Sequence, residues 1–248
     1  MTNKELTEVI QHFSRIGNKW EAKDPGNRYH YYWHDKKFID FCQIKTKQKV
    51  LDVGSGIATL AIEAYNHGAE SHALDITPEM VAAGKENAKK KHAKVTFHIG
   101  NAEKNDLPSD YFDKIISSGV PEHTPNPKAF IKEMHRILKK GGELNLQVMG
   151  EKNPLTKVYL RINRDNFRLK NLRGKEYYLK LLQEEGFKIE KVYGSTFLAL
   201  PYSKFPGKMG LAIAKLHIFI EENLLEPIFN YTNMNSWAYS FFIKARKK

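Results

Sequence analysis

The sequence predicts an α/β fold, a doubly wound and mostly parallel seven-stranded sheet with helices on both faces. Short β-branched segments ending in Gly or Asp alternate with amphipathic segments of about 10 to 15 residues, the pattern typical of parallel sheets. The 248 residues provide enough chain for a buried core. The only cysteine, Cys42, rules out an intrachain disulfide and a cysteine-clustered zinc site.

The first half of the sheet is expected within residues 49–99. Strands are expected over three segments, Lys49–Val53, Ser71–Asp75 and Val95–Ile99. Helices are expected to join them, over Ile57–Tyr65 and from Thr77 to about Lys91. Thr77 is the expected N-cap of the second helix, because Pro and Glu follow it.

The second half is expected to contain four strands, over Asp113–Ser117, Glu143–Met149, Phe187–Tyr193 and Ser236–Ala245. A helix starting at Asn126-Pro127 is expected to close at Gly141-Gly142. Further helices are expected over Lys175–Glu185 and Phe205–Leu225. Before the first strand, residues Trp20–Phe41 are rich in aromatic side chains and show no regular period.

The formal charge of +12 is unevenly distributed along the chain. Residues 50–150 carry one more acidic than basic side chain, whereas residues 151–248 carry nine more basic than acidic ones. The basic side chains are densest between Lys152 and Lys180. This block predicts contact with an anionic molecule, and an ordinary solvated surface is the alternative.

The junction between the first strand and the first helix is rich in glycine. Asp52, Gly54 and Gly56 form an acid-x-Gly-x-Gly motif, and glycines let backbone approach a ligand closely. A dinucleotide fingerprint would need a third glycine where Thr59 stands, and no phosphate-loop lysine follows. Asp75 ends the second strand, where an acid can accept hydrogen bonds from both hydroxyls of a ribose.

Further motifs follow in order: Gly100-Asn101-Ala102-Glu103, Leu107-Pro108, Ile115–His123 and Phe130–Gly142. With the glycine motif, they make residues from about Lys49 to Met149 resemble the class I S-adenosylmethionine-dependent methyltransferases, especially the ubiquinone and menaquinone biosynthesis group. The resemblance implies that the last strand is reversed and that S-adenosyl-L-methionine is the cofactor. The family often has a third glycine at Ala58 and an acid at Asn101.

The resemblance also implies a set of cofactor-binding residues. The glycine motif, with Asp52, Gly54, Ser55 and Gly56, would contact the methionine and adenosine parts, and Asp75 the ribose. Ile76 and Met80 would form the adenine surface, Asn101 and Ala102 would contact the adenine, and Ser118 the methionine part. The alternatives are an ordinary helix cap at Asp75 and a turn role for Asn101.

His123 is the candidate catalytic residue. A general base is needed only when the acceptor carries a proton at the attacked atom, and His123 follows the fourth strand at the mouth of the expected site. A structural histidine is the alternative, and a metal site with Glu122 is a weaker one, so no metal is predicted. The sequence Ser117–Pro121 lacks the Asn/Asp-Pro-Pro-Tyr/Phe motif of adenine and amide N-methylation.

We expect a single methyltransferase domain over residues 1–248. Residues 1–48 would form an N-terminal lid, residues 49–150 the donor-binding core, and residues 151–248 a substrate-covering insertion after the fifth strand and the C-terminal strands. The expected reaction is methyl transfer to a small-molecule acceptor that is anionic or lipid-linked. The alternatives are a tRNA or other RNA methyltransferase and a non-catalytic donor-binding partner. We expect a cytoplasmic protein without a secretory signal or transmembrane segment, and the oligomeric state stays open.

Overall fold

The computed structural model describes residues 7–8, 10–14, 25–155, 158, 173–198, 200, 205, 207–232 and 234–248. The strands are β1 Lys49–Val53, β2 Glu70–Asp75, β3 Val95–Ile99, β4 Phe112–Ser118, β5 Leu138–Met149, β6 Phe187–Ser195 and β7 Ser240–Lys247. The longer helices are α2 Pro25–Cys42, α3 Thr59–Asn66, α4 Pro78–Lys90, α5 Pro127–Ile137, α7 Lys175–Glu184, α8 Gly207–Ile220 and α9 Glu226–Tyr231.

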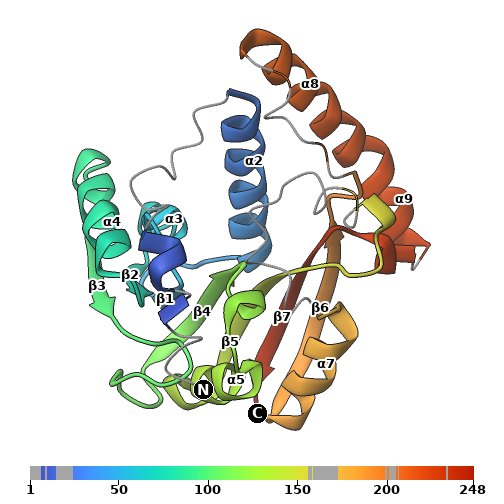
Figure 1. The fold of residues 1–248 in the computed structure, drawn as a ribbon. Coiled ribbons are helices and arrows are strands. Elements are labelled where there is room, and N and C mark those ends of the chain that lie inside the picture. The colour runs from blue at the N-terminus through green and yellow to red at the C-terminus, as the bar shows by residue number, and fades with distance from the viewer. Residues whose placement is uncertain are drawn as a thin grey trace.

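One seven-stranded sheet contains all these strands, in the order β3-β2-β1-β4-β5-β7-β6 (Figure 1). The pairs from β3 to β5 are parallel, and β7 runs antiparallel to both β5 and β6. The expected α/β fold and the reversed last strand are therefore confirmed. The carboxyl ends of β1, β2 and β4 lie at one edge of the sheet, where β7 begins.

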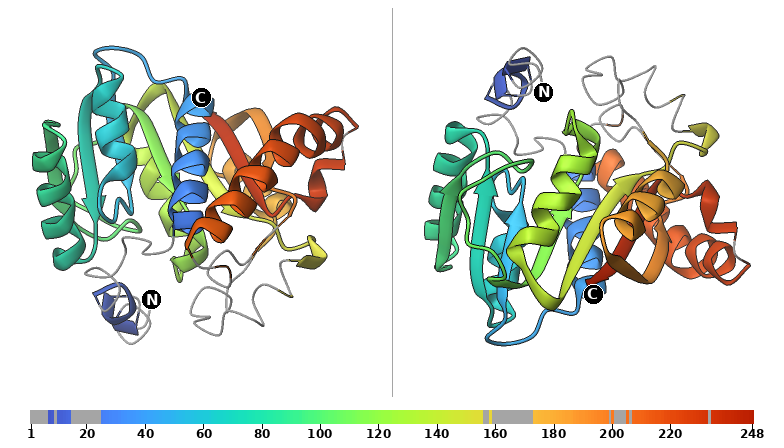
Figure 2. Two further views of the ribbon diagram at one scale, coloured as in Figure 1. Left: turned by 90° about the horizontal axis from the view of Figure 1, so that it is seen from above. Right: turned by 90° about the horizontal axis from the view of Figure 1, so that it is seen from below.

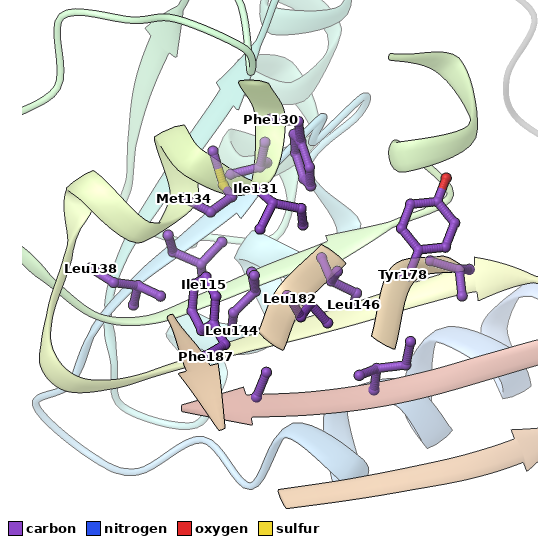
Figure 3. Close-up of a cluster of buried hydrophobic side chains, with 14 of the residues drawn as sticks. Ile115, Phe130, Ile131, Met134, Leu138, Leu144, Leu146, Tyr178, Leu182 and Phe187 are labelled. Atoms are coloured by element: carbon purple, nitrogen blue, oxygen red, sulfur yellow. The ribbon is translucent and has the colours of Figure 1, made fainter. Parts of the chain in front are cut away.

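Helices cover both faces of the sheet, as the two views of Figure 2 show. On one face, α5 and α7 pack on a large hydrophobic cluster. Figure 3 shows this cluster, in which Ile115, Leu144 and Leu146 of the sheet meet Phe130, Ile131 and Met134 of α5. On the other face α2 and α3 pack on a smaller cluster around Phe38 and Phe242, and α8 packs on α2.

The helix α2 differs from the sequence prediction, which assigned no regular structure to Trp20–Phe41. Residues 20–24 lie outside the described residues, and the rest of that segment is helical. The side chains that α2 turns inward include Trp33, Phe38 and Ile39, together with the partly buried His34. Because polar and apolar residues share the inner face, the sequence shows no 3.6-residue hydrophobic period.

The helix α5 ends earlier than predicted. It stops at Ile137, and Leu138 already has extended backbone (φ −74°, ψ 139°) and pairs with Phe112 of β4. Gly141 and Gly142 therefore lie inside β5, where Gly141 has a φ of 74° and the β4–β5 register shifts. The glycines accommodate an irregularity in a strand rather than a helix terminus.

The C-terminal boundaries also differ from the prediction. The helix expected over Phe205–Leu225 continues through a π-helical turn, Glu221–Leu225, into α9. The last strand begins at Ser240, because Met234–Trp237 forms a 3₁₀ turn. Among the described residues, no helix has both the length and the apolar character needed to span a bilayer.

Tyr178 of α7 provides a test of the packing of the apolar face. Its side chain is fully buried, and its hydroxyl has no hydrogen-bond partner among the described residues. We expect Tyr178→Phe to raise the free energy of unfolding by about 1 kcal/mol, because it removes an unsatisfied polar group. Tyr178→Ala should lower it by about 3–5 kcal/mol through a cavity. Urea denaturation measures both, and a destabilised Tyr178→Phe protein would contradict the packing described.

Candidate functional site

The loop between β1 and α3 owes its shape to two glycines. Gly54 has a φ of 69°, and its N–H and that of Ser55 both donate to the Leu74 carbonyl of β2, at 2.7 and 3.1 Å. A Cβ on Gly54 would lie 2.2 Å from Cγ2 of Val120, so only glycine fits there. Gly56 has a φ of 50°, and a Cβ there would meet nothing within 4 Å. Gly54 thus permits close packing, while Gly56 borders open space.

Ala58, which replaces the third glycine of the family motif, also has left-handed backbone. Its φ and ψ are 61° and 30° at the N-cap of α3, and its methyl group is buried against Ala61 and Ala73. Left-handed backbone costs an alanine about 1–2 kcal/mol relative to right-handed helix. This conformation gives a physical reason why glycine is common at the position, and the loop keeps its shape without it.

Asp75 links the glycine loop to the end of β2. Its Oδ2 accepts the N–H of Gly56 at 2.8 Å, and its Oδ1 accepts the N–H of Thr77 at 2.9 Å. Burial raises the pKa of Asp75, and the N–H donors of Thr77 and Gly56 oppose that rise. Thr77 is the N-cap residue of α4, as predicted, but its side chain makes no capping bond. Asp75 instead accepts the N–H of Thr77 itself, just before the helix begins.

Asp52 has a structural role in the same loop. It is buried, and its Oδ2 accepts the N–H of Ala61 in the first turn of α3 at 3.1 Å. Burial raises the pKa of Asp52 to about 8, and the carboxylates of Asp35 and Asp75 add to the rise. The sequence prediction did not include Asp35, a partly buried residue of α2. Its pKa rises to about 7 through burial and the nearby Glu63.

The residues expected around an adenine lie at the ends of β2 and β3. Met80 is buried and Ile76 is partly exposed. Asn101 uses its side-chain oxygen in a turn, because Oδ1 accepts the N–H of Glu103 at 2.9 Å. This is the alternative role that the sequence left open for Asn101. Ala102 packs partly buried against the apolar core.

Ser118, at the end of β4, belongs to a chain of hydrogen bonds that crosses the sheet. Its hydroxyl donates to Oε1 of Gln147 at 3.0 Å, and Nε2 of Gln147 donates to Oγ of Ser240 at 2.8 Å. Oγ of Ser240 lies 3.3 Å from Nε2 of His34 in α2. Burial lowers the pKa of His34 to about 4, with Lys37 contributing, so its ring is neutral at pH 7. A neutral ring with Nδ1 protonated accepts the Ser240 proton and completes the chain.

His123 ends a 3₁₀ turn, Pro121–His123, directly after β4. Its ring meets the ring of Phe13 edge to face, with centroids 5.2 Å apart. The neighbouring Ser14 donates to Oε2 of Glu79 at 3.1 Å, at the start of α4. The N-terminal residues 13 and 14 therefore contact the turn after β4 and the first turn of α4.

Glu122 is bonded to the neighbouring strand β5. It is buried, and its Oε1 accepts the backbone N–H of Met149 in β5. Among the described residues, no group of three His, Cys, Asp or Glu side chains is arranged to hold a metal ion. The geometry therefore gives Glu122 a structural role at the β4–β5 junction.

The described contacts bring most of the predicted residues to the carboxyl edge of the sheet. Gly56 and Asp75 are hydrogen-bonded, and Val120, which contacts Gly54, directly precedes the turn that holds His123. The N–H of Gly100, just before Asn101, donates to the carbonyl of Asp75 at 3.0 Å. This is the edge at which ligands bind in sheets of this topology.

Comparisons with known proteins agree with this geometry. Residues 44–187 match the model of a methyltransferase domain, more than half of the chain, so the protein belongs to that methyltransferase family. Among curated relatives, a chloroplastic 2-methyl-6-phytyl-1,4-hydroquinone methyltransferase of Arabidopsis thaliana is 35% identical over 97 residues, covering 38% of this chain and 28% of the relative. The ubiquinone biosynthesis O-methyltransferase of Xanthomonas oryzae is 27% identical over 147 residues, covering 56% and 60%.

A solved structure also has this fold. Phosphoethanolamine N-methyltransferase 2 of Haemonchus contortus, in complex with S-adenosyl-L-methionine, superposes with a TM-score of 0.60 and 22% identity, covering 86% of this chain and 52% of that chain. The chain spans less than two thirds of the length of the curated relatives described above. The comparisons thus confirm the fold class and the family that the sequence predicted.

The buried carboxyl of Asp35 gives a pH-dependent prediction. Its folded pKa of about 7 lies above the unfolded value, so its stabilising effect is complete below about pH 4 and is lost as the pH rises through 7. Asparagine does not ionise, so Asp35→Asn removes this loss. We expect the free energy of unfolding of the variant, relative to that of wild type, to be about 2 kcal/mol higher at pH 8.5 than at pH 5. Thermal denaturation at the two pH values measures the difference, and a pH-independent difference would contradict it.

Proposed function

We propose that the protein transfers a methyl group from S-adenosyl-L-methionine to a hydroxyl of a small aromatic acceptor of the quinol type. The observation that carries the proposal is the glycine loop, held by Asp75 on one side and bordering open space at Gly56 on the other. Family membership supports the reaction type, and the names of the two curated relatives support the acceptor class.

The residues at the loop suit the donor molecule. Oγ of Ser55 is buried and has no hydrogen-bond partner among the described residues, so a polar group of a ligand could satisfy it. The missing Cβ at Gly56 leaves room for close approach to the backbone. When bound, S-adenosyl-L-methionine would supply a methyl group on a sulfonium, whose sulfur is a good leaving group because it departs as a neutral thioether.

We assign the donor-binding roles from these contacts. Asp75 would accept hydrogen bonds from the ribose hydroxyls, since each of its oxygens has a further lone pair beyond its bond to backbone. Ser118 donates its proton to Gln147, which leaves its oxygen as an acceptor for the ammonium of the methionine part. Met80 and Ile76 would form the apolar surface under the adenine, and Asn101 and Ala102 its edge.

We assign His123 the role of general base for an acceptor hydroxyl. The residue lies directly after β4, on the side of the loop where Val120 contacts Gly54, and the ring of Phe13 packs against it. Edge-to-face packing fixes the plane of the imidazole. A general base needs such a fixed orientation so that its nitrogen is aligned with the hydroxyl of the methyl acceptor. Phe13, with Ser14, would also exclude water from this side, consistent with the proposed lid.

The basic block gives less support to an anionic acceptor than the sequence suggested. Residues 156–157 and 159–172 of the block lie outside the described residues. Of the described members, Lys152 pairs with Glu176 at 3.2 Å, Arg173 lies 4.7 Å from the ring centroid of Tyr177, and Lys175 lies 4.9 Å from that of Phe241. The two curated relatives are named for quinone-type acceptors, so they give the RNA alternative no support.

Donor binding tests the proposal through Asp75. Calorimetry with S-adenosylhomocysteine should show binding to the wild-type protein, and Asp75→Ala should weaken it by about 10- to 100-fold, because charge-assisted hydrogen bonds to the ribose are lost. Asp40→Asn, which alters an exposed carboxylate on α2, is the matched control and should leave binding unchanged. Absence of binding to the wild-type protein would refute the proposed function.

Turnover tests the role of His123. With a dihydroxybenzoate as the probe acceptor, His123→Ala should lower kcat by about 10²- to 10⁴-fold while the affinity for S-adenosylhomocysteine stays the same. The loss should diminish as the pH approaches the pKa of the acceptor hydroxyl, since an ionised acceptor needs no base. Equal kcat values for variant and wild type at neutral pH would remove His123 as the base.

A further inference from the structure

The continuous helix formed by α8, the π-helical turn and α9 exposes large apolar side chains. Tyr231 is 91% exposed, Phe219 63%, Leu216 62% and Leu224 52%. Met209 and Ile228 are exposed as well. With the three tyrosines of α2, Tyr29, Tyr31 and Tyr32, they make up nine of the thirteen large exposed hydrophobic side chains among the described residues. The exposure is therefore concentrated on one corner of the molecule.

These side chains lie on a single face of the helix. An α-helix turns by roughly 100° per residue. The wider π turn advances each residue by about 80°. With these steps, the six residues of the apolar stripe fall within roughly a quarter of the helix circumference: Met209, Leu216, Phe219, Leu224, Ile228 and Tyr231. Ala212 falls on the same arc, and no charged residue does.

Contacts on the opposite face of the helix fix its rotation, so that the stripe faces outward along its whole length. Ala214, His217 and Ile218 are buried there, and Glu221 and Glu226 are buried with them. Oε1 of Glu221 accepts the N–H groups of Phe197 and Leu198 at 2.8 and 2.7 Å, and Oε1 of Glu226 accepts from Ser195 and Thr196. The π turn lets both glutamates face inward, five residues apart, while Phe219, Leu224 and Ile228 remain aligned outside.

Two basic side chains lie along one side of the stripe. Lys208 and Lys215 are exposed and lie beside its arc, and the exposed Glu222 lies on the other side of the helix. Nζ of Lys215 is 5.8 Å from the ring centroid of Tyr29 in the neighbouring α2. Tyr231, at one end of the stripe, has an apolar ring and a polar tip, which suits the boundary between water and an apolar phase.

We propose that the apolar stripe rests on the surface of a lipid bilayer that contains anionic lipids. An uncharged apolar arc with lysines at its margin, on a protein of net charge +12, matches acyl chains beside negatively charged headgroups. Only one face of the helix is exposed, and the opposite face is buried in the protein with Glu221 and Glu226, so the stripe would lie in the plane of the surface. A second copy of the chain is a less suitable occupant, because a two-fold contact would bring the same lysines together.

The position of the stripe fits a peripheral enzyme. The helix α8 packs on α2, and α2 contributes His34 to the hydrogen-bond chain that reaches Ser118 at the carboxyl edge of the sheet. The helix that carries the stripe is therefore connected to the candidate site through α2. The surface stands on its own observations and does not depend on the proposed methyl transfer.

Sedimentation with phospholipid vesicles tests the proposal. The wild-type protein should bind vesicles of equal parts phosphatidylcholine and phosphatidylglycerol more tightly than vesicles of phosphatidylcholine alone. The double variant Phe219→Ser and Leu224→Ser should lose at least about tenfold in partitioning, because apolar area no longer enters the interface. Both residues are exposed, so the variant should fold, and its thermal unfolding serves as the check.

Two further variants complete the test. Ile99→Ser changes a residue that is 61% exposed on β3, the outermost strand on the side of the sheet away from β7 and β6, and should bind vesicles like wild type. Lys208→Gln with Lys215→Gln should reduce the preference for phosphatidylglycerol. Equal vesicle binding by the Phe219/Leu224 double variant and the wild type would overturn the proposal. A wild-type protein that binds no vesicles and forms a dimer, with the double variant monomeric, would also overturn it.

Discussion

The carboxylate of Asp75 is the constraint on which the arrangement of the site depends. Its two oxygens accept N–H groups from opposite directions, Gly56 in the glycine loop and Thr77 at the start of α4. The backbone of two crossover connections is thereby fixed to the end of one strand. Burying an acid raises its pKa, and these two donors return part of the free energy lost by desolvation.

The two faces of the sheet differ in polarity. Side chains that point towards α5 and α7 are apolar and fully buried, including Ile115, Leu144 and Leu146. The face under α2 instead carries polar groups, among them Asn145, which is fully buried and has no hydrogen-bond partner for its amide among the described residues. Unsatisfied buried polar groups cost free energy, and among the described residues both faces carry one, Asn145 here and Tyr178 on the α7 side.

The elements that the sequence predicted well are those with one apolar face or a short buried strand. All seven strands lie where they were expected, apart from their ends, and the glycine loop joins β1 to α3 as predicted. The helix α2 was missed because His34 and Lys37 share its inner side with Trp33. Distant partners were also invisible in the sequence: Gln147 and Ser240, which connect Ser118 to His34, lie far apart along the chain. The burial of Asp35 depends on packing that no local pattern records.

Amide chemical shifts of the isotopically labelled protein, followed by NMR during titration with S-adenosylhomocysteine, test the central claim most directly, that the loop held by Asp75 binds the methyl donor. The account predicts the largest changes at the N–H groups of Ser55, Gly56, Asn101 and Ser118, which lie at the carboxyl ends of three strands, β1, β3 and β4. Residues of α8 and α9, such as Phe219, should stay unchanged. Saturable changes that exclude Gly56 and its neighbours would contradict the account.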